Sequence, residues 1–184
     1  MTEPLTRIIN ALEESDKLHR EARARRILWV SEHKASFPVI SGRPETLKLL
    51  SEAEDTLIDG HFVATLLLAM AFIEHTIIDE LQLLDPVKGS PRFGEALKLA
   101  DKQKVFPPDW IKRANTLSVR RNSYVHLKET ENQHTLGNRV MNESLHPNAL
   151  MEADAKDAFD LMYNFFVATL REVNLDQHIT PRST

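Results

Sequence analysis

"FVATLLLAMAFIEHTIIDELQLL", residues 62–84, decides the fold of this chain, because its apolar side chains recur at helical spacing. Seven of them follow the period of three to four residues that one face of an α-helix requires: Phe62, Leu66, Met70, Ile73, Ile77, Leu81 and Leu84. The first half is apolar nearly all round, which is typical of a helix at the centre of a bundle. The longest apolar run, residues 62–73, stops at Glu74 and is too short to span a bilayer.

Helical patterns also fill most of the chain on either side of this stretch, between sparse glycines and prolines. A first helix is predicted from Thr2 to about Glu32, because apolar residues recur at helical spacing along its start. A second helix is predicted from Pro44 to Gly60, since proline favours the first turn of a helix and glycine favours its end.

Three further segments complete the predicted pattern. Ser90 and Pro91 are the expected N-cap and first residue of the next helix, and the sequence FPPDW (106–110) opens another. Residues 128–148 are polar and unperiodic, so we expect a loop or a frayed extension there. A last helix is indicated by Ala158, Leu161, Met162, Phe165 and Ala168. Acidic residues in its first turns are expected to offset the positive end of the helix dipole: Glu152, Asp154, Asp157 and Asp160.

Together these patterns predict an all-α fold, a single-domain bundle of five to six helices. A chain of 184 residues that is 42% hydrophobic is long enough to bury a proper core. We expect an N-terminal helical extension over residues 1–40, the bundle over 45–173, and a flexible tail over 174–184.

Composition and charge exclude several classes of function. The formal net charge of −4 argues against a strongly basic nucleic-acid coat protein. The absence of cysteine excludes disulfides, thiolate zinc sites and cysteine nucleophiles. The first seventeen residues carry four acids, where a secretion signal would be basic and then apolar. We therefore expect a cytoplasmic protein.

A charged residue interrupts the apolar face of the helix that follows FPPDW. The seam on that helix consists of Ile111, Ala114, Leu117, position 121 and Val125, and position 121 is an arginine. A buried guanidinium without a partner is costly, because it loses hydration and gains nothing in return. We expect Arg121 to meet either a carboxylate inside the fold or an anion outside it, and Glu74 is the first internal candidate. Its neighbour Arg120 is expected on the solvent side.

The surrounding residues, VRRNSYVHLK (119–128), suit chemistry on a phosphodiester. Asn122 and His126 are four residues apart and therefore lie about 40° apart on one helical face. Arg121 and His126 diverge by about 140°, so only the long arginine side chain would bring both onto one target. An imidazole moves protons near neutral pH, and a guanidinium holds a phosphate and the charge that grows on it. RNA supplies its own nucleophile, the 2′-hydroxyl, so no metal is required.

The same residues resemble the R-x4-6-H signature of HEPN domains, in which a polar residue follows the arginine. Arg121 and His126 fit this signature, with Asn122 in the polar place, and Arg120 fits it with five intervening residues. Residues 50–84 resemble the paired helices of the family, which are joined near a glycine. The final helix is also similar, so that the likeness covers roughly residues 45–173.

The resemblance implies a small helical domain that forms a homodimer, in which the motifs of two protomers face each other across one RNA-cleaving cleft. Active members are metal-independent endoribonucleases of toxin–antitoxin and antiviral systems, often beside an antitoxin or regulatory protein. The members paired with nucleotidyltransferase-like antitoxins commonly carry a tyrosine two residues after the histidine, and that place is Lys128 here. Other members lack activity and serve in binding or scaffolding.

Two functions remain open at this point. In the first, a metal-independent endoribonuclease, Arg121 holds the scissile phosphate, His126 is the general base or acid and Asn122 supports them. Eight basic residues against three acids between Glu95 and Lys128 would follow the RNA backbone. In the second, the chain is a non-catalytic interaction or nucleotide-binding module. Tyr124 either packs at the edge of the motif or stacks on a base. No cofactor, metal or membrane partner is expected.

Overall fold

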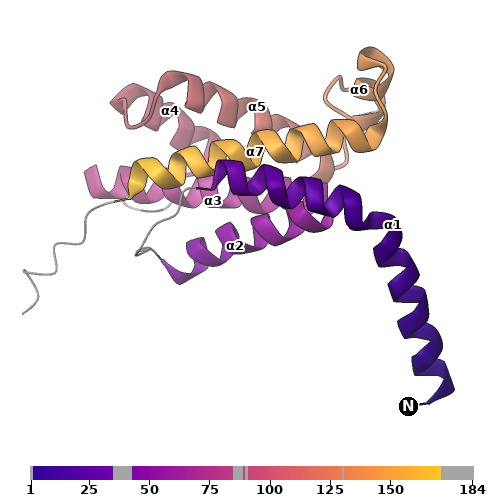
Figure 1. Cartoon of the computed structure of the whole chain (residues 1–184). Coiled ribbons are helices and arrows are strands. Elements are labelled where there is room, and N and C mark those ends of the chain that lie inside the picture. Colours follow the sequence, from indigo (N-terminus) through magenta and orange to yellow (C-terminus); the bar gives the residue numbers. More distant parts are fainter. Residues whose placement is uncertain (1, 35–42, 85–88, 90, 130, 171–184) are drawn as a thin grey trace, which may run out of the picture.

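The computed structural model describes residues 2–34, 43–84, 89, 91–129 and 131–170. These residues contain helices and no strand, which confirms the all-α prediction (Figure 1). Seven helices are present in the described part of the chain, against the five to six predicted: α1 Glu3–His33, α2 Pro44–Asp59, α3 Phe62–Leu84, α4 Phe93–Gln103, α5 Pro108–Val125, α6 Leu136–Glu143 and α7 Pro147–Thr169.

The central helix is α3, as its sequence predicts. It runs beside α7 and also packs against α2, α4 and α5, which surround it in Figure 1. Nine of its residues are buried: Thr65, Leu66, Ala69, Met70, Phe72, Ile73, Thr76, Ile77 and Leu81. Within the described residues, α3 is the one helix that is long and apolar enough to cross a membrane by length and composition, a test that the core helix of a bundle also passes.

The turn between α2 and α3 confirms the predicted helix boundaries. Gly60 ends α2 in the left-handed region (φ 84°), a backbone conformation that L-residues with a Cβ rarely adopt. Its N–H donates to the carbonyl of Leu57 (3.1 Å), and the N–H of His61 donates to Thr56 (2.8 Å). A Cβ at Gly60 would lie 3.1 Å from Nη2 of Arg26, so this turn also gives α1 a close approach.

Two of the other predicted boundaries are wrong. The helix α4 begins at Phe93 and is capped by Arg92 with Glu95, so Pro91 lies before the helix and not in its first turn. Ser90, the predicted cap, lies outside the described residues. The segment 128–148, predicted as a loop or a frayed extension, contains α6, whose N-cap Thr135 accepts a hydrogen bond from the backbone of Asn138 (3.4 Å).

The long helix α1 divides into two parts with different environments. Its second half packs on the body: Val30 is 2% exposed, the ring of Trp29 lies 5.8 Å from that of Phe159, and Nε of Arg26 donates to the carbonyl of Ile58 (2.8 Å). Its first half projects away from the bundle (Figure 1). The helix predicted from Thr2 to about Glu32 is therefore confirmed. The extension over residues 1–40 stays a prediction, and the predicted tail 174–184 lies outside the described residues.

Candidate functional site

The motif-bearing helix, α5, follows Pro107 as N-cap and carries the seam that its sequence predicts. Ile111, Ala114 and Leu117 are all buried. Val125, the last predicted seam residue, is 50% exposed, because α5 ends there. The motif therefore lies where a packed helix leaves the core.

Arg120 has a structural role, contrary to its expected solvent-side position. Its Nη1 donates to Oδ1 of Asp154 on α7 (2.8 Å), and the Asp154 side chain is only 1% exposed. A carboxylate buried to this extent requires charged partners to offset its lost hydration. Arg120 is one of these partners, so its charge is committed inside the fold.

A second arginine also pairs with the Asp154 carboxylate. Arg139 of α6 donates to Asp154 through Nη1 (2.5 Å) and Nη2 (3.1 Å), and its Nε donates to Glu143 (3.2 Å). Burial alone would lower the pKa of Arg139, but the hydrogen bonds and charge of Asp154 and then of Glu143 outweigh it and raise that pKa. Arg139 therefore stays charged and fixes α6 to α7.

The same face of α7 also binds the previous arginine of α5. Arg113 pairs with the Asp157 carboxylate, donates to the Asp157 carbonyl (2.9 Å) and reaches Asp160 (2.7 Å). Asp154, Asp157 and Asp160 follow one another at three-residue intervals on α7. Arg113 and Arg120 are seven residues apart on α5, and they meet these acids in reverse order because the two helices run antiparallel. The first turn of α7 contains no acid, so the expected offset of the helix dipole there is wrong. Three of the four acids instead form the α5–α7 ion-pair network, which comprises Arg113, Arg120, Arg139, Asp154, Asp157 and Asp160.

Arg121, in contrast, has no acid partner among the described residues. The side chain is half-buried, and its Nε is buried without a hydrogen-bond partner. Glu74, the first internal candidate for its partner, is half-buried on α3, and no ion pair or hydrogen bond between the two is present in the described part of the chain. The prediction that Arg121 interrupts the inward face is correct, and of the two open alternatives the internal carboxylate is not Glu74.

His126 lies just beyond α5, as its C-cap. Its backbone is extended (φ −121°), while its N–H still donates to the carbonyl of Asn122 (3.0 Å). The predicted stacking of Asn122 on His126 presupposed a helix through position 126, and the helix ends one residue earlier. His126 is exposed and Asn122 is half-buried, so the imidazole is open to solvent at the edge of the bundle.

Tyr124 lies on the inner side of the motif, near the ion-pair network. Its hydroxyl oxygen is buried without a hydrogen-bond partner. Burial, and then the negative charge of Asp154, raise the pKa of this phenol, while Arg139 and Arg120 act in the opposite direction. Of its two predicted roles, packing at the motif edge agrees with this position.

The basic surface predicted between Glu95 and Lys128 is weaker than its residue count suggests. Arg113 and Arg120 are neutralised by the acids of α7. Arg121 is half-buried, and the remaining basic residues are exposed lysines: Lys98, Lys102, Lys104, Lys112 and Lys128. The part of this surface that is free to meet an anion is therefore carried by lysines and by Arg121.

Two hollows of the body lie away from the motif. One, of about 480 Å³, lies between α1 and α7, and the other, of about 340 Å³, lies between α2 and α3. Neither is lined by Arg121 or His126. Among the described residues there is also no group of three His, Cys, Asp or Glu placed to hold a metal ion.

The sequence did not lead us to expect Asp154 and Arg139 beside the motif, where both belong to the ion-pair network around Arg120. A signal for Asp154 was present, because acids at 154, 157 and 160 recur on one face of α7 as Arg113 and Arg120 do on α5. No comparable signal marks Arg139. Comparisons with protein-family models, with curated proteins and with solved structures found no match for this chain.

Proposed function

We propose that this chain is a cytoplasmic, metal-independent endoribonuclease of the HEPN type that acts in bacterial toxin–antitoxin or antiviral defence. The observation that carries the proposal is the contrast between two adjacent arginines. Arg120 is committed to buried Asp154, while the Arg121 guanidinium has no acid partner in the described part of the chain. A cation that the fold leaves unpaired, five residues from an exposed imidazole, is suited to hold a phosphate.

The proposed reaction uses the 2′-hydroxyl of the RNA as nucleophile. His126 takes the 2′-hydroxyl proton, the 2′-oxygen bonds to the adjacent phosphorus, and the bond from phosphorus to the 5′-oxygen breaks. The leaving 5′-oxygen receives a proton from a general acid, either the second protomer's imidazole or water. The products are a 2′,3′-cyclic phosphate and a 5′-hydroxyl. Arg121 neutralises the charge that grows on the phosphate oxygens, and Asn122 donates a hydrogen bond.

The proposed partners follow from the same site. RNA is the substrate, and the exposed lysines of α4 and α5 contact its backbone. A homodimer brings two copies of the motif together, and an antitoxin or regulatory protein holds the activity in check.

The test is a cleavage assay with purified protein, several unrelated RNAs and excess EDTA. We expect cleavage that resists EDTA and leaves 2′,3′-cyclic phosphate ends, and we expect Arg121→Ala and His126→Ala to abolish it. His75→Ala serves as a matched control, because this histidine is exposed on α3, a different helix. Intact RNAs with wild-type protein, or full activity in His126→Ala, would reject the proposal.

The alternative is a non-catalytic interaction or nucleotide-binding module. It is favoured by one observation, namely that neither of the two hollows described above contains His126. In this case Arg121 anchors a phosphate that is never cleaved. Nucleotides would then raise the melting temperature of the wild type and not that of Arg121→Ala, while RNA stays intact in both.

A further inference from the structure

The projecting half of α1 carries an apolar stripe that nothing in the described part of the chain covers. Leu5, Ile8 and Leu12 lie within about 60° of one another around the helix and are 46%, 57% and 63% exposed. Single exposed apolar side chains are common, but a row of large ones on one helical face marks a contact surface.

The stripe lies in phase with the face of α1 that packs on the body. Ile8 and Leu12 precede Arg26 and Val30 by 18 residues, which is about five full helical turns. Arg26 reaches the carbonyl of Ile58, and Val30 is buried. One face of α1 is therefore built for contact along its whole length, and the described chain covers only its second half.

Charge divides α1 at the same place. Residues 3–16 carry four acids and one arginine: Glu3, Arg7, Glu13, Glu14 and Asp16. Residues 17–26 carry five basic residues and one acid: Lys17, Arg20, Glu21, Arg23, Arg25 and Arg26. The first half of one such helix is complementary to the second half of another when the two run antiparallel, whereas a parallel pair would bring like charges together.

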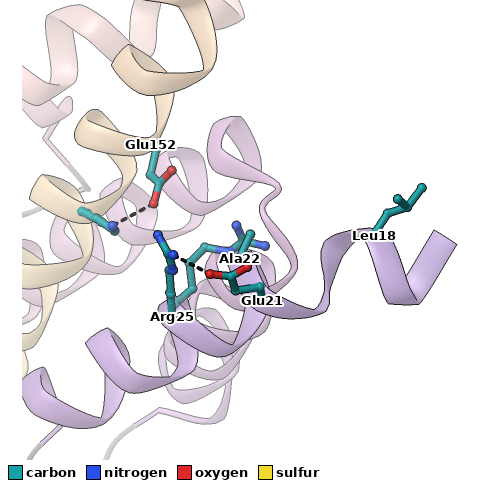
Figure 2. A pocket seen from close by; sticks show the side chains of 7 residues that line it. Leu18, Glu21, Ala22, Arg25 and Glu152 are labelled. Atoms are coloured by element: carbon teal, nitrogen blue, oxygen red, sulfur yellow. Dashed lines mark hydrogen bonds and ion pairs between the residues drawn. The ribbon is translucent and has the colours of Figure 1, made fainter. Parts of the chain in front are cut away.

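A cleft lies beside the basic half. It has a volume of about 480 Å³. Figure 2 shows that α1 contributes Leu18, Glu21, Ala22 and Arg25 to it and that Glu152 of α7 lies opposite. Its walls combine apolar and basic side chains with two acids already held within their own helices: Leu18, Glu21, Ala22, Arg25, Arg26, Glu152 and Lys156. Glu21 pairs with Arg25, and Glu152 pairs with Lys156 (2.7 Å). These pairs also balance Arg25 and Lys156, so the three bases and two acids of the wall leave one net positive charge. The cleft therefore suits a segment that is apolar on one side and carries an acid beside it.

We propose that the occupant is residues 3–16 of a second copy of this chain. In this homodimer, each α1 lies antiparallel to its partner, and the acidic half of each covers the basic half and the α1–α7 cleft of the other. The arrangement is two-fold symmetric, so that one contact is made twice and closes the assembly. Fourteen helical residues span about 21 Å, and two such contacts are needed to approach the area of a stable interface, about 800 Å² per partner.

This inference does not depend on the proposed ribonuclease activity, because no residue of 3–26 belongs to the motif. The two also fail separately, because the mass measurement needs no RNA. A wild type that is dimeric but does not cleave RNA rejects only the ribonuclease, and a monomeric wild type that cleaves RNA rejects this dimer and the motif-facing homodimer but not the catalysis.

The first experiment measures the mass of the full chain by sedimentation, from about 1 to 100 µM. We expect a dimer for the wild type and a monomer for Ile8→Glu with Leu12→Glu, which places charge in the stripe. Asn10→Glu is the matched control, because position 10 lies on the opposite face of the same turns, and this variant stays dimeric. The unfolding midpoint measured at monomer-forming concentrations stays unchanged in all three, since Ile8, Asn10 and Leu12 are exposed in the described structure.

The second experiment tests the antiparallel charge pairing. A Glu13→Lys, Glu14→Lys variant and a Lys17→Glu, Arg20→Glu variant should each dimerise at least tenfold more weakly, and their equimolar mixture should recover a heterodimer. A monomeric wild type, a dimer that survives Ile8→Glu with Leu12→Glu, or a mixture that recovers nothing would each overturn the proposal.

Discussion

Arg139 of α6 holds Asp154 of α7 through a two-pronged contact, with Nη1 at 2.5 Å and Nη2 at 3.1 Å from the two carboxylate oxygens. Their side chains are 9% and 1% exposed, the lowest values for any ion pair among the described residues. Arg120 of α5 contacts the same carboxylate, so a single acid joins α5, α6 and α7. The motif at the end of α5 is positioned by this acid.

Replacing that acid should therefore destabilise the fold strongly. In Asp154→Asn the shape is kept, but Arg139 and Arg120 lose their counter-charge, which typically costs about 3–5 kcal/mol in the free energy of unfolding. Urea denaturation measures this loss. Glu152→Gln on the same helix breaks only a half-exposed pair with Lys156 and should cost less than about 1 kcal/mol. Similar losses in the two variants would contradict a special role for Asp154.

The two adjacent arginines should respond differently to the same substitution. Arg120→Met removes a charge-assisted hydrogen bond to a buried carboxylate, and we expect a loss of about 1.5–3 kcal/mol. Arg121→Met keeps the packed methylene stem and removes a buried Nε that has no partner, so stability should stay the same or rise slightly. Denaturation in guanidinium chloride measures the unfolding free energy of both variants. A larger loss of unfolding free energy in Arg121→Met than in Arg120→Met would show that Arg121, and not Arg120, supports the fold.

Much of the helical architecture is predictable, because it depends on local signals. The bounds of α3 follow from its period, and Pro44 and Gly60 mark α2 through effects within one turn. Local sequence signals do not predict the helix α6. It is short, and its one buried residue is the polar Arg139, so its place depends on an ion pair with a residue fifteen positions later and not on an apolar pattern.

At the candidate site, too, features that depend on one helix are predictable from the sequence, and features that depend on distant residues are not. The seam predicts correctly that Arg121 faces inward, since that follows from the phase of α5 alone. The expectation of a solvent-side Arg120 fails because the pattern of a single helix does not reveal which acid a neighbouring helix presents. That acid is 34 residues further along the chain, on α7. The end of α5 before His126 is likewise outside the reach of periodicity, because the pattern fades there without a glycine or proline.

The left-handed turn at Gly60 gives a further prediction. Gly60→Ala places a Cβ where φ is 84° and 3.1 Å from Nη2 of Arg26, whose Nε is already hydrogen-bonded to Ile58. We expect a loss of about 1–2 kcal/mol in unfolding free energy. Gly94→Ala is the matched control of opposite sign, because Gly94 lies in α4 with open space around it, and alanine there should stabilise by up to about 1 kcal/mol. An equal effect at both positions would contradict this reading of the turn.

Stability should also fall at alkaline pH through Tyr163 of α7. Burial, then the charge of Glu54 and a hydrogen bond to it, raise the pKa of this phenol to about 12, against about 10 in an unfolded chain. The folded state therefore holds the proton more tightly, and its advantage, complete below pH 10, is lost as the pH rises from about 10 to 12. Urea midpoints measured across this range should fall less steeply in Tyr163→Phe than in the wild type. Parallel curves would show that Tyr163 does not contribute.

We propose that Arg121 and His126 act on a phosphodiester while Arg120 supports the fold. The most direct test is the single-turnover rate of RNA cleavage in EDTA, measured beside the unfolding free energy of each variant. We expect Arg121→Ala and His126→Ala each to lose at least about 100-fold in rate and to keep wild-type stability within about 1 kcal/mol. A wild type without cleavage, or a His126→Ala variant that cleaves at the wild-type rate, would contradict it.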